Sequence, residues 1–124
     1  MKAIAFTTPG GPEVLEVMDL PDPQVGEGQV LVRVQATAVS PVDLGIRARK
    51  RSETPTVVGM DAAGVIEAIG EGTETDLTVG DNVMAFILPR GTHGGYAQRG
   101  SPYRLLLLLE CLKARPSLKL PLCR

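Results

Sequence analysis

The stretch GEGQVLVRVQATA, residues 26–38, decides the fold class of this chain. After its two glycines, aliphatic residues occupy every second position, and this period of two is typical of a strand with one buried face. We therefore expect a strand from Gln29 to Ala38. Arg33, Gln35 and Thr37 are expected together on its more polar face.

Short β-branched runs of the same kind recur between turn residues along the first hundred positions. The chain contains 14 Gly and 10 Pro, which at this spacing indicate an all-β domain rather than a helix bundle. Further strands are expected at residues 2–6, 14–18, 62–69, 83–86 and 94–98.

One short helix is expected at residues 41–47. Ser40 suits the N-cap of this helix, and Pro41 suits its first position. Beyond it, Gly59 and Gly64 predict a tight turn and then a strand of small residues that another backbone approaches closely. We take these glycines as evidence for the fold and not for a site.

Composition excludes several classes of function. A formal net charge of −1 and only two Phe and two Tyr give neither the basic surface nor the stacking platforms of a nucleic-acid-binding protein. The start MKAIAF leads into a strand pattern without the features of a secretory leader. The longest apolar run, Leu105–Leu109, is far shorter than the roughly 20 residues of a membrane helix. We expect a reduced, soluble, cytoplasmic protein with no nucleic-acid or membrane partner.

The composition changes abruptly late in the chain. From Ser101 onward there is no Gly and no Val, and leucine dominates. A short helix is expected from Tyr103 to Ala114, ended by Pro116. We expect two parts, a β domain at residues 1–99 and an atypical, partly disordered tail at residues 100–124. One hypothesis is that the tail arises from a frameshift, an early stop or a misassembled gene.

Five motifs occur in order along the β domain. They are MKAIAF (1–6), PQVGEGQVLVRVQATAVSPVD (23–43), PTVVGMDAAGVIEAIGEG (55–72), VGDNVMAF (79–86) and GGYAQ (94–98). Together they resemble the N-terminal GroES-like domain of medium-chain dehydrogenase/reductases, and in particular the zinc-free quinone reductase branch. The resemblance implies a mainly β fold, a partly open and irregular β barrel with one or two short helices. It also implies a missing nucleotide-binding domain, because no G-x-G-x-x-G motif follows a strand.

The resemblance bears on metal binding as well. Zinc-dependent relatives place a Cys ligand where this chain has Ser40, and a Gly-His-Glu segment where it has Gly59-Met60-Asp61. Zinc needs three or four ligands from Cys, His and carboxylates, so Asp61 alone does not suffice. We therefore expect no metal. The resemblance implies direct hydride transfer from NADPH to an electron-poor quinone or enone.

Four residues are candidates for the site. By resemblance, Ser40 faces the nicotinamide and the substrate and is the candidate catalytic residue; its alternative role is a helix N-cap. Pro41, Asp43 and Met60 are candidates for the edge of the substrate and cofactor site. The alternative for Asp43 is to hold the local turn, and the alternative for Met60 is ordinary core packing.

Three further features have weaker functional interpretations. Gly45 stands where quinone reductases often carry a larger side chain, which would leave the acceptor site wider. His93, the single histidine, is conceivable as a general acid, but a loop histidine without a carboxylate partner is more often simply exposed. The basic cluster Arg49–Arg51 suits a solvated loop better than a phosphate site.

The expected function is that of the substrate-side domain of a zinc-independent, NADPH-dependent quinone or enone oxidoreductase, incomplete and weakly active or inactive alone. NADPH is not expected to bind tightly to this chain. One alternative is a non-enzymatic GroES-like module that binds a partner or self-associates through Leu105–Leu109. Another is a fragment of a zinc alcohol dehydrogenase, which Ser40 and Met60 oppose.

Overall fold

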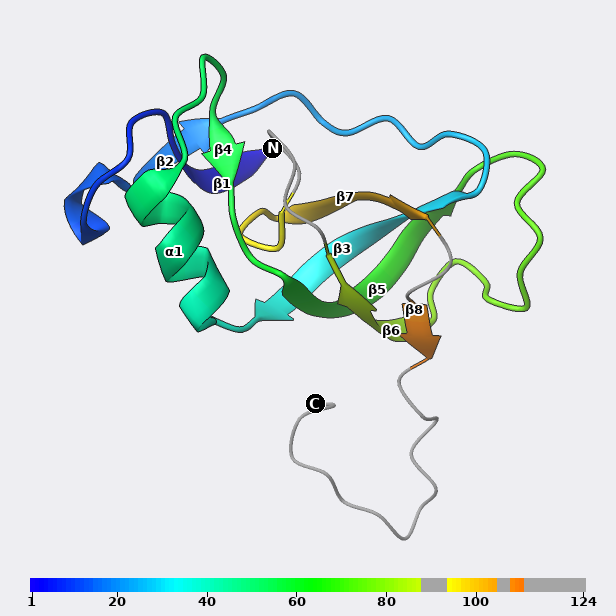
Figure 1. The fold of residues 1–124 in the computed structure, drawn as a ribbon. Coiled ribbons are helices and arrows are strands. Elements are labelled where there is room, and N and C mark those ends of the chain that lie inside the picture. Colours follow the sequence, from blue (N-terminus) through cyan, green and yellow to red (C-terminus); the bar gives the residue numbers. More distant parts are fainter. Residues whose placement is uncertain (88–93, 105–107, 111–124) are drawn as a thin grey trace, which may run out of the picture.

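The computed structural model describes residues 1–87, 94–104 and 108–110, and it is mainly β (Figure 1). The strands are β1 (Lys2–Phe6), β2 (Glu16–Asp19), β3 (Gln29–Thr37), β4 (Thr56–Val57), β5 (Asp61–Ile69), β6 (Asn82–Phe86), β7 (Arg99–Arg104) and β8 (Leu108–Glu110). The helices are the 3-10 turn η1 (Pro12–Val14) and α1 (Pro41–Arg49). Within the described ranges, no helix is long and apolar enough to cross a membrane.

The strands form two open sheets. The smaller has the order β2-β1-β4 and the larger the order β7-β3-β5-β6-β8, with every neighbouring pair antiparallel. The segment before β7 joins them, since Ile4 N donates to Tyr96 O at 2.8 Å and Gln98 N donates to Lys2 O at 3.0 Å. The expected mainly β, partly open and irregular fold is confirmed in this form, as two sheets that do not close.

Each sheet contributes its own apolar core. The larger sheet buries aliphatic side chains of β3, β5 and β6 and of the residue after β6, namely Val30, Val32, Ala62, Ile66, Val83, Ala85 and Ile87. The smaller sheet buries Ala3, Ala5 and Val57 together with Ala97. Helix α1 runs from the end of β3 back towards the smaller sheet (Figure 1).

The strand expected at residues 29–38 is confirmed as β3, with one deviation. Val30 and Val32 are buried, and Arg33, Gln35 and Thr37 are exposed, as the alternation predicts. The register against β5 shifts at two places, and the second shift lies between Val34 and Ala36. Such a bulge changes the direction of the following side chains, and beyond it the aliphatic positions are exposed as well.

The helix expected from Tyr103 to Ala114 is wrong in the described part of that range. Tyr103 belongs to β7, where it pairs with Val30 of β3, and residues 108–110 form β8, which pairs with β6. The open edges of β3 and β6 carry unpaired backbone groups, and pairing along them outweighs the helix propensity of leucine. The expected boundary after residue 99 falls within β7, so the two-part division stays a prediction.

The strand expected at residues 94–98 is only partly present. It is reduced to a single bridge between Ala97 and Ala3, and regular pairing begins at Arg99. The segment also closes against the turn before β5, because Gly95 N donates to Gly59 O at 2.9 Å. It therefore serves as the seam between the two sheets.

Candidate functional site

Helix α1 begins with a reciprocal cap between Ser40 and Asp43. Ser40 N donates to Asp43 Oδ2 at 2.9 Å, and Asp43 N donates to Ser40 Oγ at 3.5 Å. Pro41 occupies the first helical position, where its missing N–H costs nothing. The expected helix and its cap are confirmed, and the helix continues to Arg49. A carboxylate here also complements the positive end of the helix dipole.

Asp43 is the buried centre of this region, with 2% of its surface exposed. Its Oδ1 accepts from Gly59 N at 2.9 Å, while Oδ2 accepts from Ser40 Oγ at 3.0 Å and from the Tyr96 hydroxyl at 3.5 Å. A buried charge is tolerated when donors surround it in this way. The predicted alternative role of holding the local turn matches these contacts, and a direct role of Asp43 at the substrate stays a prediction.

Gly59 makes this arrangement sterically possible. Its φ of 102° lies in the region that favours glycine, and a Cβ there would stand 2.6 Å from Cδ1 of Tyr96. The tight turn expected at Gly59 is thereby confirmed. So is the close approach expected at Gly64, where a Cβ would overlap the carbonyl oxygen of Arg33.

Tyr96 is the site residue that sequence reasoning missed. Its backbone is fixed between Ile4 and Val58, with Tyr96 N donating to Val58 O at 2.9 Å. Burial, and then the negative charge of Asp43, raise the pKa of Tyr96 above its ordinary value. The available signal was an aromatic residue directly after two glycines, which predicts close packing of a ring against a backbone without side chains.

The four predicted site residues lie around the start of α1 and the start of β5. Ser40 is half-buried and Pro41 exposed at the helix start, and Asp43 lies buried beneath them. Met60 is half-buried, follows Gly59, and accepts a backbone hydrogen bond from Ile87. The bond between Asp43 and Gly59 joins the start of α1 to the residue before Met60.

Two exposed aliphatic side chains flank Ser40 in the sequence. Val39 is 72% exposed and Val42 is 51% exposed, on either side of the cap. An added Cβ at Gly45, in the middle of α1, meets nothing within 4 Å, and the wider acceptor site expected from its missing side chain stays a prediction. The predicted role of His93 concerns a residue outside the described ranges.

A separate groove of about 480 Å³ lies at the seam between the two sheets. Residues of β1, β2, the end of β3 and the 95–98 segment line it, and Tyr96 and Val39 are among them. Of the described residues that line it, none is Ser40, Pro41, Asp43 or Met60. The groove therefore meets the candidate site only at its border.

The donor set does not suit a metal ion. In the described part of the chain, no three His, Cys, Asp or Glu side chains lie close enough together to hold one. Ser40 donates its hydroxyl to Asp43 instead, and the exposed Asp61 is fixed through its backbone oxygen, which accepts from Thr37 Oγ1 at 2.6 Å.

Several known proteins resemble this chain. A quinone oxidoreductase of Lama guanicoe is 40% identical over 101 residues, which are 78% of this chain and 30% of the relative. A chloroplastic NADPH-dependent alkenal/one oxidoreductase of Arabidopsis thaliana is 37% identical over 99 residues, which are 76% of this chain and 25% of the relative. The solved structure of a mycobacterial protein complexed with NADPH aligns with a TM-score of 0.79 and 32% identity over 92% of this chain and 34% of its own.

The chain therefore spans less than a third of the length of these two relatives. Residues 26–107, more than half of the chain, match the alcohol dehydrogenase GroES-like domain. This match covers β3, α1, β5 and β6, and with them Ser40 directly before α1, Asp43 within α1 and Met60 directly before β5. The chain belongs to the family of alcohol dehydrogenase GroES-like domains.

Proposed function

We propose that this chain forms the substrate-side wall of a zinc-independent, NADPH-dependent reductase of quinones or enones. The observation that carries the proposal is the Ser40 hydroxyl, held by Asp43 between the exposed side chains of Val39 and Val42. The relatives named quinone oxidoreductase and alkenal/one oxidoreductase support the class of substrate. Independence from zinc rests on Ser40 and Met60, which supply no ligands of the kind zinc prefers.

In this proposal, the residues of the chain position ligands and exclude water. NADPH, when bound, supplies the hydride that together with a proton converts a quinone to a hydroquinone. Pro41 and Met60 give an apolar wall against which flat rings stack, and Ser40 gives one directed hydrogen bond. Such positioning is a large part of what a protein contributes when the cofactor carries the chemistry.

The pyrophosphate of the cofactor requires a part of the protein outside this chain. No glycine-rich phosphate turn follows a strand in the sequence, so the contacts of this chain are confined to the nicotinamide end. We therefore propose that the 124 residues alone are weakly active or inactive, and that NADPH binds them weakly.

A chimaera tests the proposal. Residues 1–99 are joined to the part of the Lama guanicoe quinone oxidoreductase that follows the matched region, and NADPH oxidation is followed at 340 nm with 1,4-benzoquinone or an enone. We expect oxidation that depends on the acceptor and that persists in EDTA. Ser40→Ala in the chimaera should lower kcat/KM about tenfold, the effect of one lost hydrogen bond.

Two results would contradict the proposal. A folded chimaera that binds NADPH but oxidises it no faster with any acceptor would refute the reductase function. Loss of the activity in EDTA, with recovery on adding zinc, would refute independence from the metal. The uncatalysed reaction of NADPH with each acceptor is the background, and the intact relative is the positive control.

A further inference from the structure

We propose that the Ser40 hydroxyl meets its ligand only as a hydrogen-bond acceptor, and that it therefore binds the carboxamide N–H of a nicotinamide rather than the carbonyl oxygen of the quinone or enone. Asp43 is then the positioning residue that fixes this polarity. The inference rests on the proposed function and makes it more specific, because it assigns Ser40 to the cofactor and not to the acceptor substrate.

The first step concerns the charge of Asp43. Four hydrogen bonds converge on its carboxylate, from Gly59 N, Ser40 N, Ser40 Oγ and the Tyr96 hydroxyl. The two backbone N–H groups can only donate, and each carboxylate oxygen receives one of them. A proton on either oxygen would compete with one of these donors. The geometry therefore fits the ionised carboxylate, which accepts and does not donate.

The second step concerns the single proton of Ser40. Its hydroxyl oxygen lies 3.0 Å from Asp43 Oδ2. Because the ionised carboxylate has no proton to offer, the hydroxyl proton must point at Asp43. Ser40 then has no proton left for a ligand. This direction of the Ser40 hydroxyl proton is stable, because Asp43 is buried and a charge-assisted hydrogen bond is stronger than one to a neutral group.

The third step concerns what remains available at Ser40. The hydroxyl oxygen has two lone pairs, and one of them is used by Asp43 N at the long distance of 3.5 Å. The side chain is half-buried, so a ligand can reach the other lone pair. The next residue, Pro41, has no backbone N–H and adds no donor beside it. Ser40 thus presents an acceptor to the ligand.

The preference among ligands follows from this polarity. A carbonyl oxygen opposite Ser40 would place two acceptors together and gain no hydrogen bond. A carboxamide offers N–H donors on the same planar frame, and one such bond favours it over a ring of equal size that lacks the donor. The carbonyl of the acceptor substrate must therefore take its hydrogen bond from another donor.

The test compares two probes of nearly identical shape, nicotinamide and 3-acetylpyridine, which differ by an NH2 or CH3 group on the carbonyl. Each is titrated into the uniformly ¹⁵N-labelled 124-residue chain, and the amide signals of residues 39–43 and 59–61 are followed by NMR. We expect nicotinamide to bind about threefold to tenfold more tightly, the value of one net hydrogen bond.

Two variants locate the source of this preference. Ser40→Ala removes the acceptor and should bring the affinity ratio to about one, whereas Ser40→Thr keeps both the hydroxyl and the helix cap and should retain the preference. A spectrum with native dispersion confirms the fold of each variant. If Ser40→Ala fails to fold, equal affinities of the unmodified chain for the two probes, or loss of the preference in folded Ser40→Thr, still overturn the inference.

The outcomes separate this inference from the proposed function. Equal affinities for the two probes, with shifts at the expected amides, would overturn the inference and leave the proposed function standing. A preference that survives in folded Ser40→Ala would overturn it too, as would its loss in folded Ser40→Thr. Absence of shifts at residues 39–43 and 59–61 with either probe would overturn this role of Ser40 and leave the proposed function, which expects only weak cofactor binding to this chain, to the chimaera.

Discussion

Asp43 and Asp22 both tie distant segments of the chain together, but they do so in opposite surroundings. Asp43 is 2% exposed, and its partners are mostly uncharged backbone and hydroxyl donors. The side chain of Asp22 is 51% exposed, and its partners are full charges, the N-terminal ammonium of Met1 at 2.9 Å and Arg99 at 2.6 Å. Asp43 is thus a buried carboxylate held by uncharged donors, and Asp22 is an exposed carboxylate held by charged groups.

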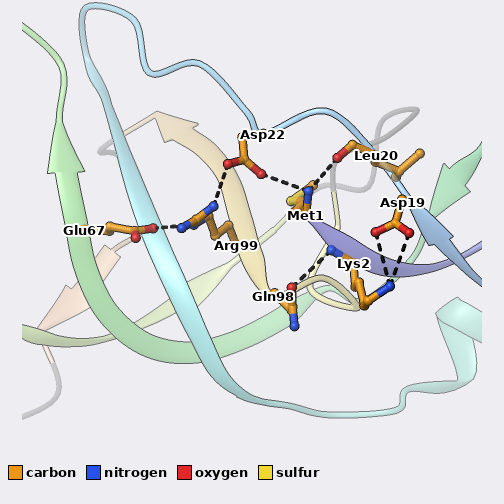
Figure 2. Close-up of polar contacts among 8 residues, drawn as sticks. All are labelled: Met1, Lys2, Asp19, Leu20, Asp22, Glu67, Gln98 and Arg99. Carbon is orange, nitrogen blue, oxygen red and sulfur yellow. Dashed lines mark hydrogen bonds and ion pairs between the residues drawn. The ribbon is translucent and has the colours of Figure 1, made fainter.

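Figure 2 shows the exposed site, in which contacts continue beyond Asp22. Arg99 bridges Asp22 and Glu67, with a distance of 3.0 Å to the latter, and the Met1 ammonium also donates to Leu20 O at 2.6 Å. This network connects the N-terminal residue, which precedes β1, with β5 and β7. Water can replace each of its contacts, whereas the donors around Asp43 have no such substitute. Burial should therefore decide which site matters more for stability.

The largest expected effect is that of Asp43→Ala. This change leaves the N–H of Gly59 buried without an acceptor and removes the cap of α1, so the free energy of unfolding should fall by about 3 kcal/mol. Urea denaturation followed by circular dichroism measures the change. Asp19→Ala, which removes a carboxylate that is 77% exposed, is the matched control and should change stability by no more than about 0.5 kcal/mol. Equal effects of the two substitutions would refute the argument from burial.

A second test disturbs the backbone at Gly59, whose N–H donates to Asp43, and leaves the Asp43 carboxylate in place. Gly59→Ala combines a positive φ with contact against Tyr96, and we expect a loss of about 2 to 3 kcal/mol. Gly80 has a φ of 99° but open space around an added Cβ, so Gly80→Ala isolates the backbone term, about 1 kcal/mol. Gly45→Ala, within α1, should stabilise the chain by up to about 1 kcal/mol.

The test depends on the order of the changes in unfolding free energy among these three glycine variants. If Gly59→Ala costs no more than Gly80→Ala, the ring of Tyr96 is not packed as tightly against Gly59 as the structure shows. If Gly45→Ala destabilises the chain, α1 carries a constraint that its open surroundings do not reveal. The same urea experiment serves all three variants.

The comparison also shows what the sequence could predict. The strand of residues 29–37 and the cap by Ser40 depend on local signals, a period of two and a serine before a proline, and both were predicted correctly. The bond between Asp43 and Tyr96 joins residues 53 positions apart, and no local pattern encodes it. The helix expected after Tyr103 failed for the same reason, because the open edge of β3 lies far away in the sequence.

A smaller effect is expected for the outermost partner of Asp43. Tyr96→Phe removes the longest of the four hydrogen bonds and should cost about 1 kcal/mol. In a Tyr103→Phe background, Tyr96 is the only tyrosine, so its ionisation can be followed by absorbance at 295 nm. It should ionise above the ordinary pKa of about 10, chiefly through burial, and Asp43→Asn should lower this pKa part of the way back.

The sign of the pH dependence follows from the raised pKa of Tyr96. The unfolded chain ionises first, so the contribution of Tyr96 to stability is complete below about pH 10 and is lost as the pH rises through the pKa of the folded state. A Tyr96 that titrates at the same pH in the folded chain and in urea would show that neither burial nor Asp43 acts on it.

The smallest effect at neutral pH is expected for Asp22→Asn, and its dependence on conditions identifies its cause. The hydrogen bond from the N-terminal ammonium, and then the charge of Arg99, hold the pKa of Asp22 below its ordinary value of about 3.9. The stabilisation is therefore complete above that value and is lost as the pH falls through the lower pKa of the folded state.

The stability difference between the native chain and Asp22→Asn should shrink below about pH 4, and it should also shrink in 1 M NaCl, because salt screens exposed charges. Asp43→Asn is the control in salt, because the contacts of Asp43 are buried and should respond much less. A salt-sensitive loss in Asp22→Asn as large as that in Asp43→Asn would show that the counter-charges of Asp22, and not burial, dominate the stability of this domain.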